Sequence, residues 1–133
     1  MRIPPPLLGL SIPLTLLLAG CGSTDYTDHQ FGSISELSEA AEDAGLDCGD
    51  RIFDPRSDEA LEEELASKGW AQDGYGRSCV VMLFDSDAKR DEVIATSLEE
   101  GEAFLTGGNW GINGGQYPVE AVAEKMGGEL HLG

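Results

Sequence analysis

Cys79-Val80-Val81-Met82-Leu83-Phe84 is an unbroken apolar run of strand length. A strand that faces water on one side alternates apolar and polar residues, and this stretch does not alternate. The run therefore predicts a central strand that is buried on both faces, or nearly so. We expect the rest of the chain to supply the elements that cover it.

Four segments have the apolar spacing and the end signals of helices. Ser33 and Glu36 have capping-box spacing, so their side chains can satisfy free backbone N–H groups at a helix start. Ser57 and Ser86 can each cap a further helix, and Pro118 stands at the favoured first position of a fourth. The expected helices cover residues 34–44, 58–68, 87–99 and 118–126.

The strands predicted beside the central one are short. A segment from Cys48 to Phe53 carries apolar residues and is closed by an Asp-Pro turn. Gly107-Gly108 is a two-residue hairpin signal between two further candidates. The additional strands are expected at residues 48–53, 103–106, 109–112 and 129–132, and residues 73–76 are expected to form a loop or turn.

This alternation of helices and short strands indicates an α+β fold. Apolar stripes on the helices predict a small two-layer sandwich, a mostly antiparallel sheet with the helices on one face. A ferredoxin-like arrangement is one such fold, although the order of the strands is not readable from the sequence. Residues 33–133 are expected to form this single domain.

The first 20 residues have the pattern of a secretory signal peptide. Arg2 precedes an apolar stretch from Leu7 to Leu18 that contains Pro13. About 12 residues of helix rise about 18 Å, well short of the roughly 30 Å hydrocarbon core of a bilayer. We therefore expect residues 1–20 to be removed and leave them out of the fold.

The end of this leader is more specific than an ordinary cleavage site. Leu18-Ala19-Gly20-Cys21 resembles the lipobox of bacterial lipoproteins at all four positions. The resemblance implies cleavage before Cys21, lipidation of its thiol, and anchoring at the outer face of the cytoplasmic membrane. An ordinary secreted protein with a chance cysteine is the alternative. Residues 21–32 would then be the lipidated cysteine and a flexible tether.

Lipidation of Cys21 leaves two cysteines, Cys48 and Cys79. An exported domain in an oxidising compartment pairs its cysteines, so we predict a disulfide between them. A redox-active or metal-binding thiol is the competing interpretation, but the sequence has no C-x-x-C spacing and no histidine near either residue.

The charge limits the classes of partner. After removal of Arg2, 7 basic residues face 25 acidic ones, a net charge of −18. Such a surface repels phosphates, so we expect no nucleic-acid binding and no direct binding to anionic headgroups. Cationic partners would be attracted to it, although diffuse acidity is more often a feature of solubility.

The most unusual stretch for chemistry runs from Gly107 to Gly115. Its glycines expose backbone N–H groups around an aromatic residue, which makes Asn109, Trp110 and Asn113 candidate ligand-binding residues. A hairpin with a core tryptophan explains the same residues, and that interpretation is favoured. The stretch has neither the spacing of a phosphate loop nor that of a dinucleotide site.

No catalytic set is visible, and we expect no cofactor or metal. The acidic residues from Asp85 to Glu92 resemble a calcium loop, but Lys89 and Arg90 stand where an oxygen ligand and a glycine are needed. His29 and His131 lie at opposite ends of the mature chain, so no histidine triad is suggested. A hydrolase remains the least favoured possibility.

The mature chain as a whole resembles small uncharacterised actinobacterial lipoproteins. The shared pattern is the lipobox, a capped helix ending near a cysteine, a second cysteine opening an apolar strand, Gly-Gly-Asn-Trp, and the final helix around residues 119–128. The resemblance implies an envelope location and no catalytic residues. We therefore expect a non-enzymatic module that binds an envelope protein or ligand, or alternatively an acidic inhibitor or shield of cationic envelope proteins.

Overall fold

The computed structural model describes residues 25–48, 56–75 and 79–133. In this part of the chain, four helices are α2 (Ile34–Asp43), α3 (Asp58–Lys68), α4 (Asp87–Ser97) and α5 (Gln116–Met126). Five strands are β1 (Trp70–Tyr75), β2 (Cys79–Phe84), β3 (Glu102–Thr106), β4 (Trp110–Gly115) and β5 (Glu129–Leu132). Apart from Cys48, which lies in no strand, the segment predicted as a strand at 48–53 is outside the described residues.

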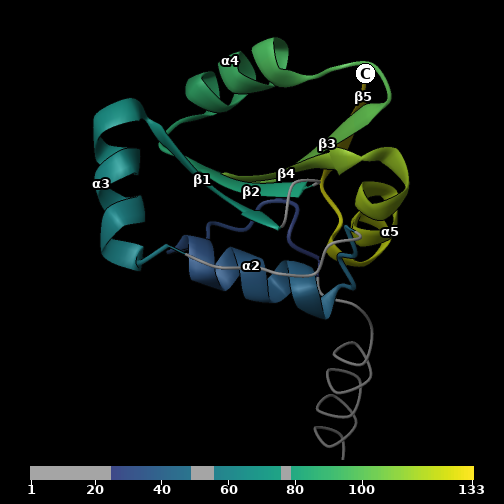
Figure 1. Ribbon diagram of the computed structural model, residues 1–133, viewed down its shortest axis with the longest axis horizontal. Helices are drawn as coiled ribbons and strands as arrows, with labels where there is room; N and C mark the ends of the chain where they lie inside the picture. The colour runs from purple at the N-terminus through teal and green to yellow at the C-terminus, as the bar shows by residue number, and fades with distance from the viewer. Residues whose placement is uncertain (1–24, 49–55, 76–78) are drawn as a thin grey trace, which may run out of the picture.

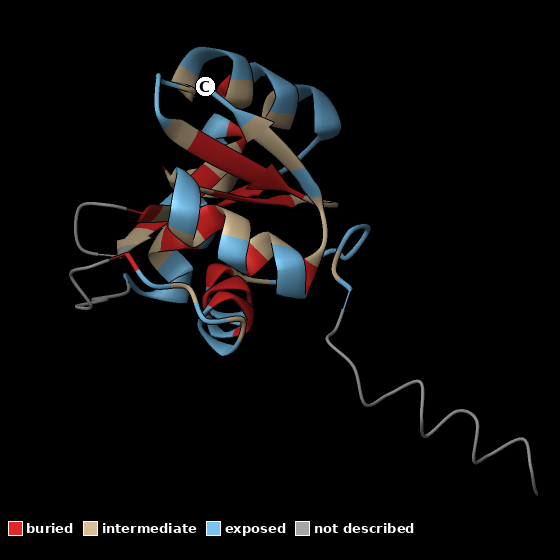
Figure 2. Cartoon of the chain, turned by 90° about the vertical axis from the view of Figure 1, so that its right-hand side faces the viewer, coloured by how far each residue is buried: buried red, intermediate tan, exposed pale blue. Residues whose placement is uncertain are grey.

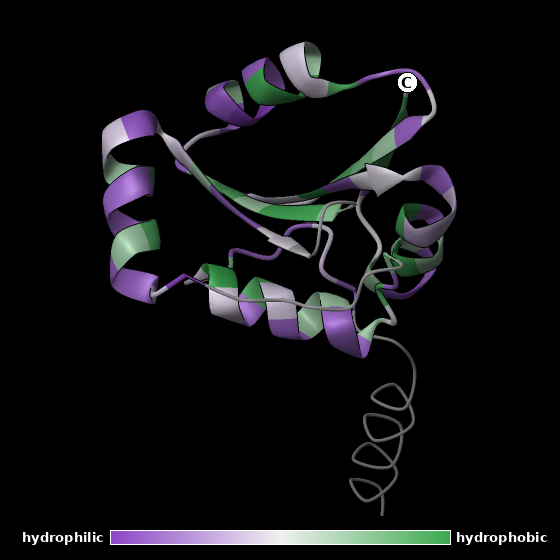
Figure 3. Cartoon of the chain, in the orientation of Figure 1, coloured by the Kyte–Doolittle hydropathy of each residue, from purple (hydrophilic) through white to green (hydrophobic). Residues whose placement is uncertain are grey.

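The α+β class and the antiparallel sheet are confirmed. The strands form one sheet in the order β1-β2-β4-β3-β5, and every neighbouring pair is antiparallel. The predicted strand β2 is buried on both faces, because Val81 and Leu83 belong to one core cluster and Met82 and Phe84 to the other. Figure 3 accordingly shows β2 in green, the hydrophobic end of the scale, whereas purple hydrophilic residues recur along the helices.

Three of the four helices in the described part of the chain lie on one face of the sheet, so the prediction that the helices share one face is wrong for α4. Helices α2, α3 and α5 contribute buried residues such as Leu37, Leu61 and Val122 to the larger core cluster. Helix α4 lies on the opposite face, where Val93 packs with Met82, Phe84 and Phe104 in a smaller cluster (Figure 1). Figure 2 accordingly shows buried residues, in red, along the strands of the sheet.

The connections of the sheet explain why α4 and α5 lie on opposite faces. The β2-α4-β3 and β4-α5-β5 connections each join parallel strands and step over one strand in the same direction. Such crossovers are almost always right-handed, and β2 and β4 run antiparallel. Two right-handed crossovers that step the same way from antiparallel strands must place their helices on opposite faces.

The strand order also differs from that of a ferredoxin-like sheet. In that arrangement the last strand crosses back and pairs with the first strand of the β-α-β-β-α-β unit, which here is β2. In this protein β5 pairs with β3 at the other edge, and the partner of β2 on that side is the additional strand β1.

Strand β1 is a correction, because residues 73–76 were expected to form a loop or turn. Trp70 to Tyr75 pair with β2 over six registered positions, from Trp70 opposite Phe84 to Tyr75 opposite Cys79. Asp73 and Gly74 favour turns in isolation. Here the buried Asp73 carboxylate accepts hydrogen bonds from the backbone N–H groups of Arg56 and Gly74, which satisfies it within the strand.

The boundaries around α5 also differ from the prediction. The strand was expected to end at residue 112. Strand β4 instead continues through Asn113 and Gly114 to Gly115. Helix α5 begins at Gln116, so Pro118 is its third residue instead of its first. This placement costs no backbone hydrogen bond, because N–H groups in the first turn of a helix have no partner within the helix.

The predicted helix ends are confirmed in their chemistry. The side chains of Ser33, Ser57 and Ser86 each accept a hydrogen bond from the backbone N–H three residues later. After α2, Gly45 adopts a left-handed φ of +89°, and Leu46 donates its N–H to the carbonyl of Ala41 at 3.0 Å. This pattern is a Schellman motif, which satisfies carbonyls that the helix leaves free.

The predicted disulfide is present between Cys48 and Cys79, with 5.9 Å between the Cα atoms. It joins the segment after α2 to the first residue of β2, and both cysteines belong to the larger core cluster. Within the described ranges, none of the helices has the length and hydrophobicity that a membrane span requires.

Candidate functional site

The side chains of the three candidate ligand-binding residues all form hydrogen bonds with backbone groups of this chain. Asn109 lies at the tip of the β3–β4 hairpin, where its side-chain amide accepts a hydrogen bond from the N–H of Phe31 at 2.8 Å. The same amide donates to the carbonyl of Phe31 at 2.9 Å. Asn113 donates to the carbonyl of Ala103 on the neighbouring strand at 3.1 Å. The Asn109 side chain therefore satisfies both the N–H and the carbonyl of Phe31, as the backbone of a paired strand would.

Trp110 is fully buried, and its ring lies in the larger core cluster. Its indole N–H donates a 3.0 Å hydrogen bond to the carbonyl of Tyr26, and its ring lies edge-on to Phe31 at 6.1 Å. The indole therefore offers no free face or donor to a ligand in this conformation. The glycine-rich hairpin instead forms a dock for the segment that precedes α2.

Close packing of this segment accounts for the glycines of the hairpin. A Cβ atom on Gly108 would collide with the backbone carbonyl of His29, and one on Gly107 would collide with the indole of Trp110. Glycine allows two backbones to approach more closely than any other residue does. The unusual stretch is thus explained by contact within the chain.

The segment before α2 corrects the expected tether. Residues 21–24 lie outside the described residues, but residues 25–32 are attached to the domain. Tyr26 donates its N–H to the carbonyl of Met126 at 2.7 Å, and the hydroxyl of Thr27 accepts from the N–H of Gly128 at 3.1 Å. Phe31 is buried in the core. The folded domain therefore begins at least eight residues before the predicted residue 33.

Thr27 also orders the start of this segment. Its hydroxyl and its backbone N–H both donate to the carboxylate of Asp25. These hydrogen bonds, the one from the hydroxyl first, hold the pKa of the Asp25 carboxyl below its usual range, because they favour the charged form. The Asp25–Thr27 turn thus contains the two residues, Tyr26 and Thr27, that bond to Met126 and Gly128 at the end of α5.

An aromatic hollow forms where this segment meets the outer side of α2. The rings of Tyr26, His29 and Phe31 cluster, with centroid distances of 5.2 Å, 5.3 Å and 4.5 Å for the three pairs. The hollow has a volume of about 250 Å³. Its lining consists of these three aromatic residues together with Glu36, Glu39, Ala40 and Asp43 of α2.

The carboxylates that line the hollow are not accompanied by lysine or arginine in its lining. Residues 25–48 contain seven acidic residues and no lysine or arginine. Glu36, Glu39 and Asp43 are exposed, and the ion pairs among the described residues all lie elsewhere. Glu36, Glu39 and Asp43 therefore form no ion pair with a basic side chain of the described part of the domain.

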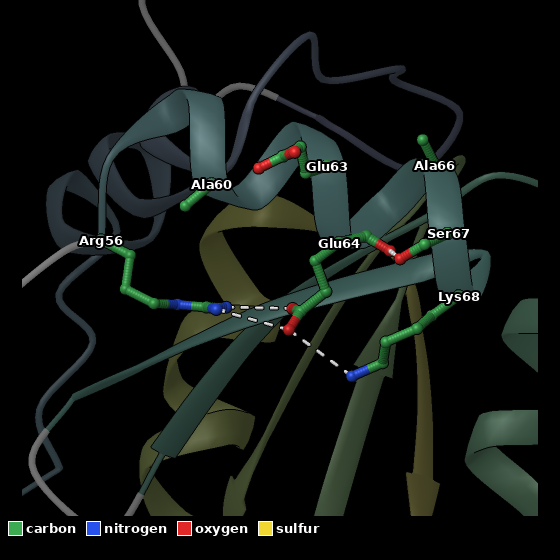
Figure 4. Close-up of a pocket in the computed structure, with 7 residues that line it drawn as sticks. All are labelled: Arg56, Ala60, Glu63, Glu64, Ala66, Ser67 and Lys68. Carbon is green, nitrogen blue, oxygen red and sulfur yellow. Dashed lines mark hydrogen bonds and ion pairs between the residues drawn. The ribbon is translucent and has the colours of Figure 1, made fainter.

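A second hollow, of about 700 Å³, lies along α3 and is shown in Figure 4. Glu64 points toward Arg56 and Lys68, with N–O distances of 3.0 Å and 3.5 Å. Arg56 reaches both carboxylate oxygens of Glu64, and the N–H of Gln72 on β1 donates to the same carboxylate at 3.0 Å. This carboxylate thus accepts hydrogen bonds from four donors of the chain itself. The cluster therefore joins α3 to β1, and its carboxylate is already engaged in structural contacts.

The charges of this cluster reinforce one another. The guanidinium of Arg56, above all through its hydrogen bonds, holds the pKa of the Glu64 carboxyl below its usual range, against an opposing effect of burial. The N–H of Gln72 and the positive charges of Arg56 and Lys68 act in the same direction. The same carboxylate raises the pKa of Arg56. Both side chains therefore stay charged at neutral pH.

The acidic residues Asp87, Asp91 and Glu92 of α4 form ion pairs with basic residues of the same helix. Ser86 caps the helix, and Lys89 pairs with Glu92 at 2.7 Å. Arg90 donates to the carbonyls of Gly107 and Gly108 at 3.1 Å each, which ties α4 to the β3–β4 hairpin. In the described part of the chain, no group of three or more His, Cys, Asp or Glu side chains is arranged to hold a metal ion.

No protein-family model matches the chain, and no match is found among the curated proteins or the solved structures.

The aromatic hollow was missed by the sequence analysis, which assigned Tyr26, His29 and Phe31 to a tether. One signal was available in the sequence. Three aromatic or imidazole rings within six residues are unusual for a flexible linker, which is normally poor in such residues. The long-range partners of these residues, Asn109 and Trp110, are about 80 residues away and cannot be paired with them by local pattern.

Proposed function

We propose that this protein is a non-enzymatic interaction module held at the outer face of the cytoplasmic membrane by lipid on Cys21. The similarity of Leu18-Ala19-Gly20-Cys21 to a lipobox supports the anchor. The Cys48–Cys79 disulfide is compatible with an oxidising, extracytoplasmic compartment. A lipoprotein carries at least two acyl chains, which is enough for stable attachment to a bilayer.

The observation that carries the proposal is the attachment of Tyr26 to the domain. Its N–H and its carbonyl are bonded to Met126 and Trp110, five residues after Cys21. Five residues span at most about 17 Å when fully extended. A lipid on Cys21 would therefore hold the domain close to the bilayer, with the Tyr26 side toward it. A protein that presents one fixed side at a membrane is suited to binding a partner there.

A more specific second candidate is an acidic inhibitor or shield of cationic envelope proteins. The net charge of −18 after cleavage supports it, as does the lack of any lysine or arginine between residues 25 and 48. Attraction at this charge density acts over a Debye length of roughly 8 Å at physiological ionic strength, so it would favour partners that carry basic segments.

The anchor is tested by comparing the full chain with Cys21→Ser in a bacterial host. We expect the wild-type chain in the membrane fraction, with mass spectrometry showing a diacylated or triacylated N-terminal cysteine. We expect the Cys21→Ser variant to leave the membrane fraction. An unmodified Cys21 in the mature protein would contradict the anchor, and turnover of a substrate that a single carboxylate substitution abolishes would contradict the non-enzymatic role.

A further inference from the structure

We propose that the hollow between Tyr26, His29, Phe31 and the outer side of α2 binds an arginine side chain from a basic protein segment. This inference rests on the proposed role as an interaction module and names the chemistry of its partner. It starts from a concave surface with two kinds of wall, aromatic on one side and carboxylate on the other.

The aromatic wall favours an organic cation. A guanidinium within about 6 Å of an aromatic ring is attracted by the negative face of the ring. His29 is exposed and Tyr26 is half-buried, so both rings are partly accessible from solvent, while Phe31 is buried behind them. The pairing of Phe31 with Asn109 and the bond from Trp110 to Tyr26 hold the segment in place. The wall therefore exists before any ligand binds.

The carboxylate wall supplies the opposite charge. Glu36, Glu39 and Asp43 lie three and four residues apart along α2, which places them on one side of the helix. None of them takes part in an ion pair with a described residue. An arginine side chain can stack on the rings with its planar surface and donate N–H groups to these carboxylates from its edge.

Size and chemistry distinguish this occupant from other cations. A hollow of about 250 Å³ accommodates one long side chain and not a folded domain. Calcium and magnesium require several oxygen ligands around one point, and the described residues contain no such group. Lysine carries a compact, strongly hydrated charge that cannot stack as a plane, so arginine fits both walls better than lysine does.

The test uses the purified full chain in detergent micelles and calorimetric titration at about 50 mM and 150 mM salt. The probe is the acetylated, amidated peptide Gly-Arg-Gly-Gly-Arg-Gly, and two matched peptides carry lysine or citrulline in place of arginine. Citrulline has the shape of arginine without its charge. We expect the arginine peptide to bind at least tenfold more tightly than the citrulline peptide and at least threefold more tightly than the lysine peptide.

Two variants with the same change in charge separate a site from diffuse attraction. Glu39→Gln/Asp43→Asn removes two carboxylates from the hollow, and Glu59→Gln/Glu63→Gln removes two exposed carboxylates at the same spacing on α3. We expect the first to weaken binding of the arginine peptide at least tenfold and the second by less than twofold. His29→Ala should reduce the preference for arginine over lysine. All substituted positions are exposed, and unchanged circular dichroism melts verify folding.

Three results would overturn the inference. They are no binding of the arginine peptide, an equal loss in the two charge variants, or equal affinity for arginine and lysine peptides that His29→Ala leaves unchanged. None of these results depends on attachment to a bilayer, because the titration uses the purified chain in detergent micelles. If the wild-type chain is lipidated and the Cys21→Ser variant leaves the membrane fraction, but the arginine peptide does not bind, the proposed location is retained. Only the proposed ligand is then lost.

Discussion

The indole N–H of Trp110 donates a 3.0 Å hydrogen bond to the backbone carbonyl of Tyr26, 84 residues earlier in the chain. This bond joins a core residue of the sheet to the segment that would follow a lipid anchor. It also places the rings of the hollow, because Tyr26, His29 and Phe31 all belong to the segment that Trp110 and Asn109 hold. The conformation of residues 25–31 therefore depends on their hydrogen bonds to the β3–β4 hairpin.

Trp110→Phe should loosen this segment while preserving an aromatic core residue. The substitution removes the donor to Tyr26 and leaves a smaller ring, so we expect a loss of about 1–3 kcal/mol in the free energy of unfolding. Urea unfolding measures this loss, and hydrogen exchange at the amides of Tyr26 and Phe31 should accelerate. Trp70→Phe is the control, because Trp70 is only partly buried and lies outside the larger cluster. Unchanged exchange in Trp110→Phe would contradict the docking role.

Asn109→Ala should release Phe31 specifically. The substitution removes both hydrogen bonds to the Phe31 backbone, and we expect a cost of about 1–3 kcal/mol with faster exchange of the Phe31 amide. Asn109→Asp keeps an acceptor for that amide but directs a carboxylate at the Phe31 carbonyl, so it should cost at least as much as Asn109→Ala. Asn113→Ala removes one bond to Ala103 and should leave exchange at Phe31 as in the wild type.

Removal of the disulfide should destabilise the domain strongly. Cys48 and Cys79 are 31 residues apart, and closing a loop of that length contributes about 3–4 kcal/mol on the chain-entropy model. We therefore expect Cys48→Ala/Cys79→Ala to lose about this much in urea unfolding of the oxidised protein. Cys21→Ser, which leaves the disulfide intact, should unfold at the wild-type urea concentration. A double variant as stable as the wild type would contradict a structural role for the bridge.

Glu64→Gln should reveal a pH-dependent contribution from the Arg56 cluster. The folded state lowers the pKa of Glu64 below its ordinary value of 4.5, so the stabilisation is fully present above that value and is lost as the pH falls through the lower pKa of the folded state. At neutral pH we expect Glu64→Gln to cost about 1 kcal/mol, because Arg56 is partly exposed and solvent weakens the pair.

The difference in unfolding free energy between wild type and Glu64→Gln should therefore shrink as the pH falls below about 4.5. Chemical unfolding at a series of pH values measures this difference directly, so that the other carboxylates cancel. Glu63→Gln, at the exposed neighbouring position, should show no such trend. A gap between wild type and Glu64→Gln that stays constant through acid pH would show that the Glu64 charge does not matter.

The elements that could be predicted are those whose signals are local. Ser33, Ser57 and Ser86 cap the helices that they were expected to cap, because a cap needs only a side chain and a backbone N–H three residues later. Strand β2 was predicted correctly because its apolar run admits burial on both faces. The pairing of Cys48 with Cys79 followed from the cysteine count once Cys21 was assigned to the lipid.

The elements that could not be predicted depend on distant partners. Strand β1 contains Asp73 and Gly74, which favour a turn until pairing with β2 and the N–H of Arg56 satisfy them. The binding role considered from sequence for Asn109 and Trp110 was based on backbone N–H groups exposed by the glycines, and a hairpin with a core tryptophan was favoured over it. In the fold, both side chains are instead bonded to residues 26 and 31.

The sequence by itself determined the serine caps of α2, α3 and α4, the buried central strand, the α+β class and the strongly acidic charge, since each follows from neighbouring residues or from composition. Only the tertiary structure decided the strand order, the separation of α4 and α5 onto opposite faces, and the attachment of residues 25–32. The physical reason is that a backbone group or a ring can be satisfied by many partners of the same kind. Which partner it meets is decided when the whole sheet closes, as Tyr26 meets Trp110 here.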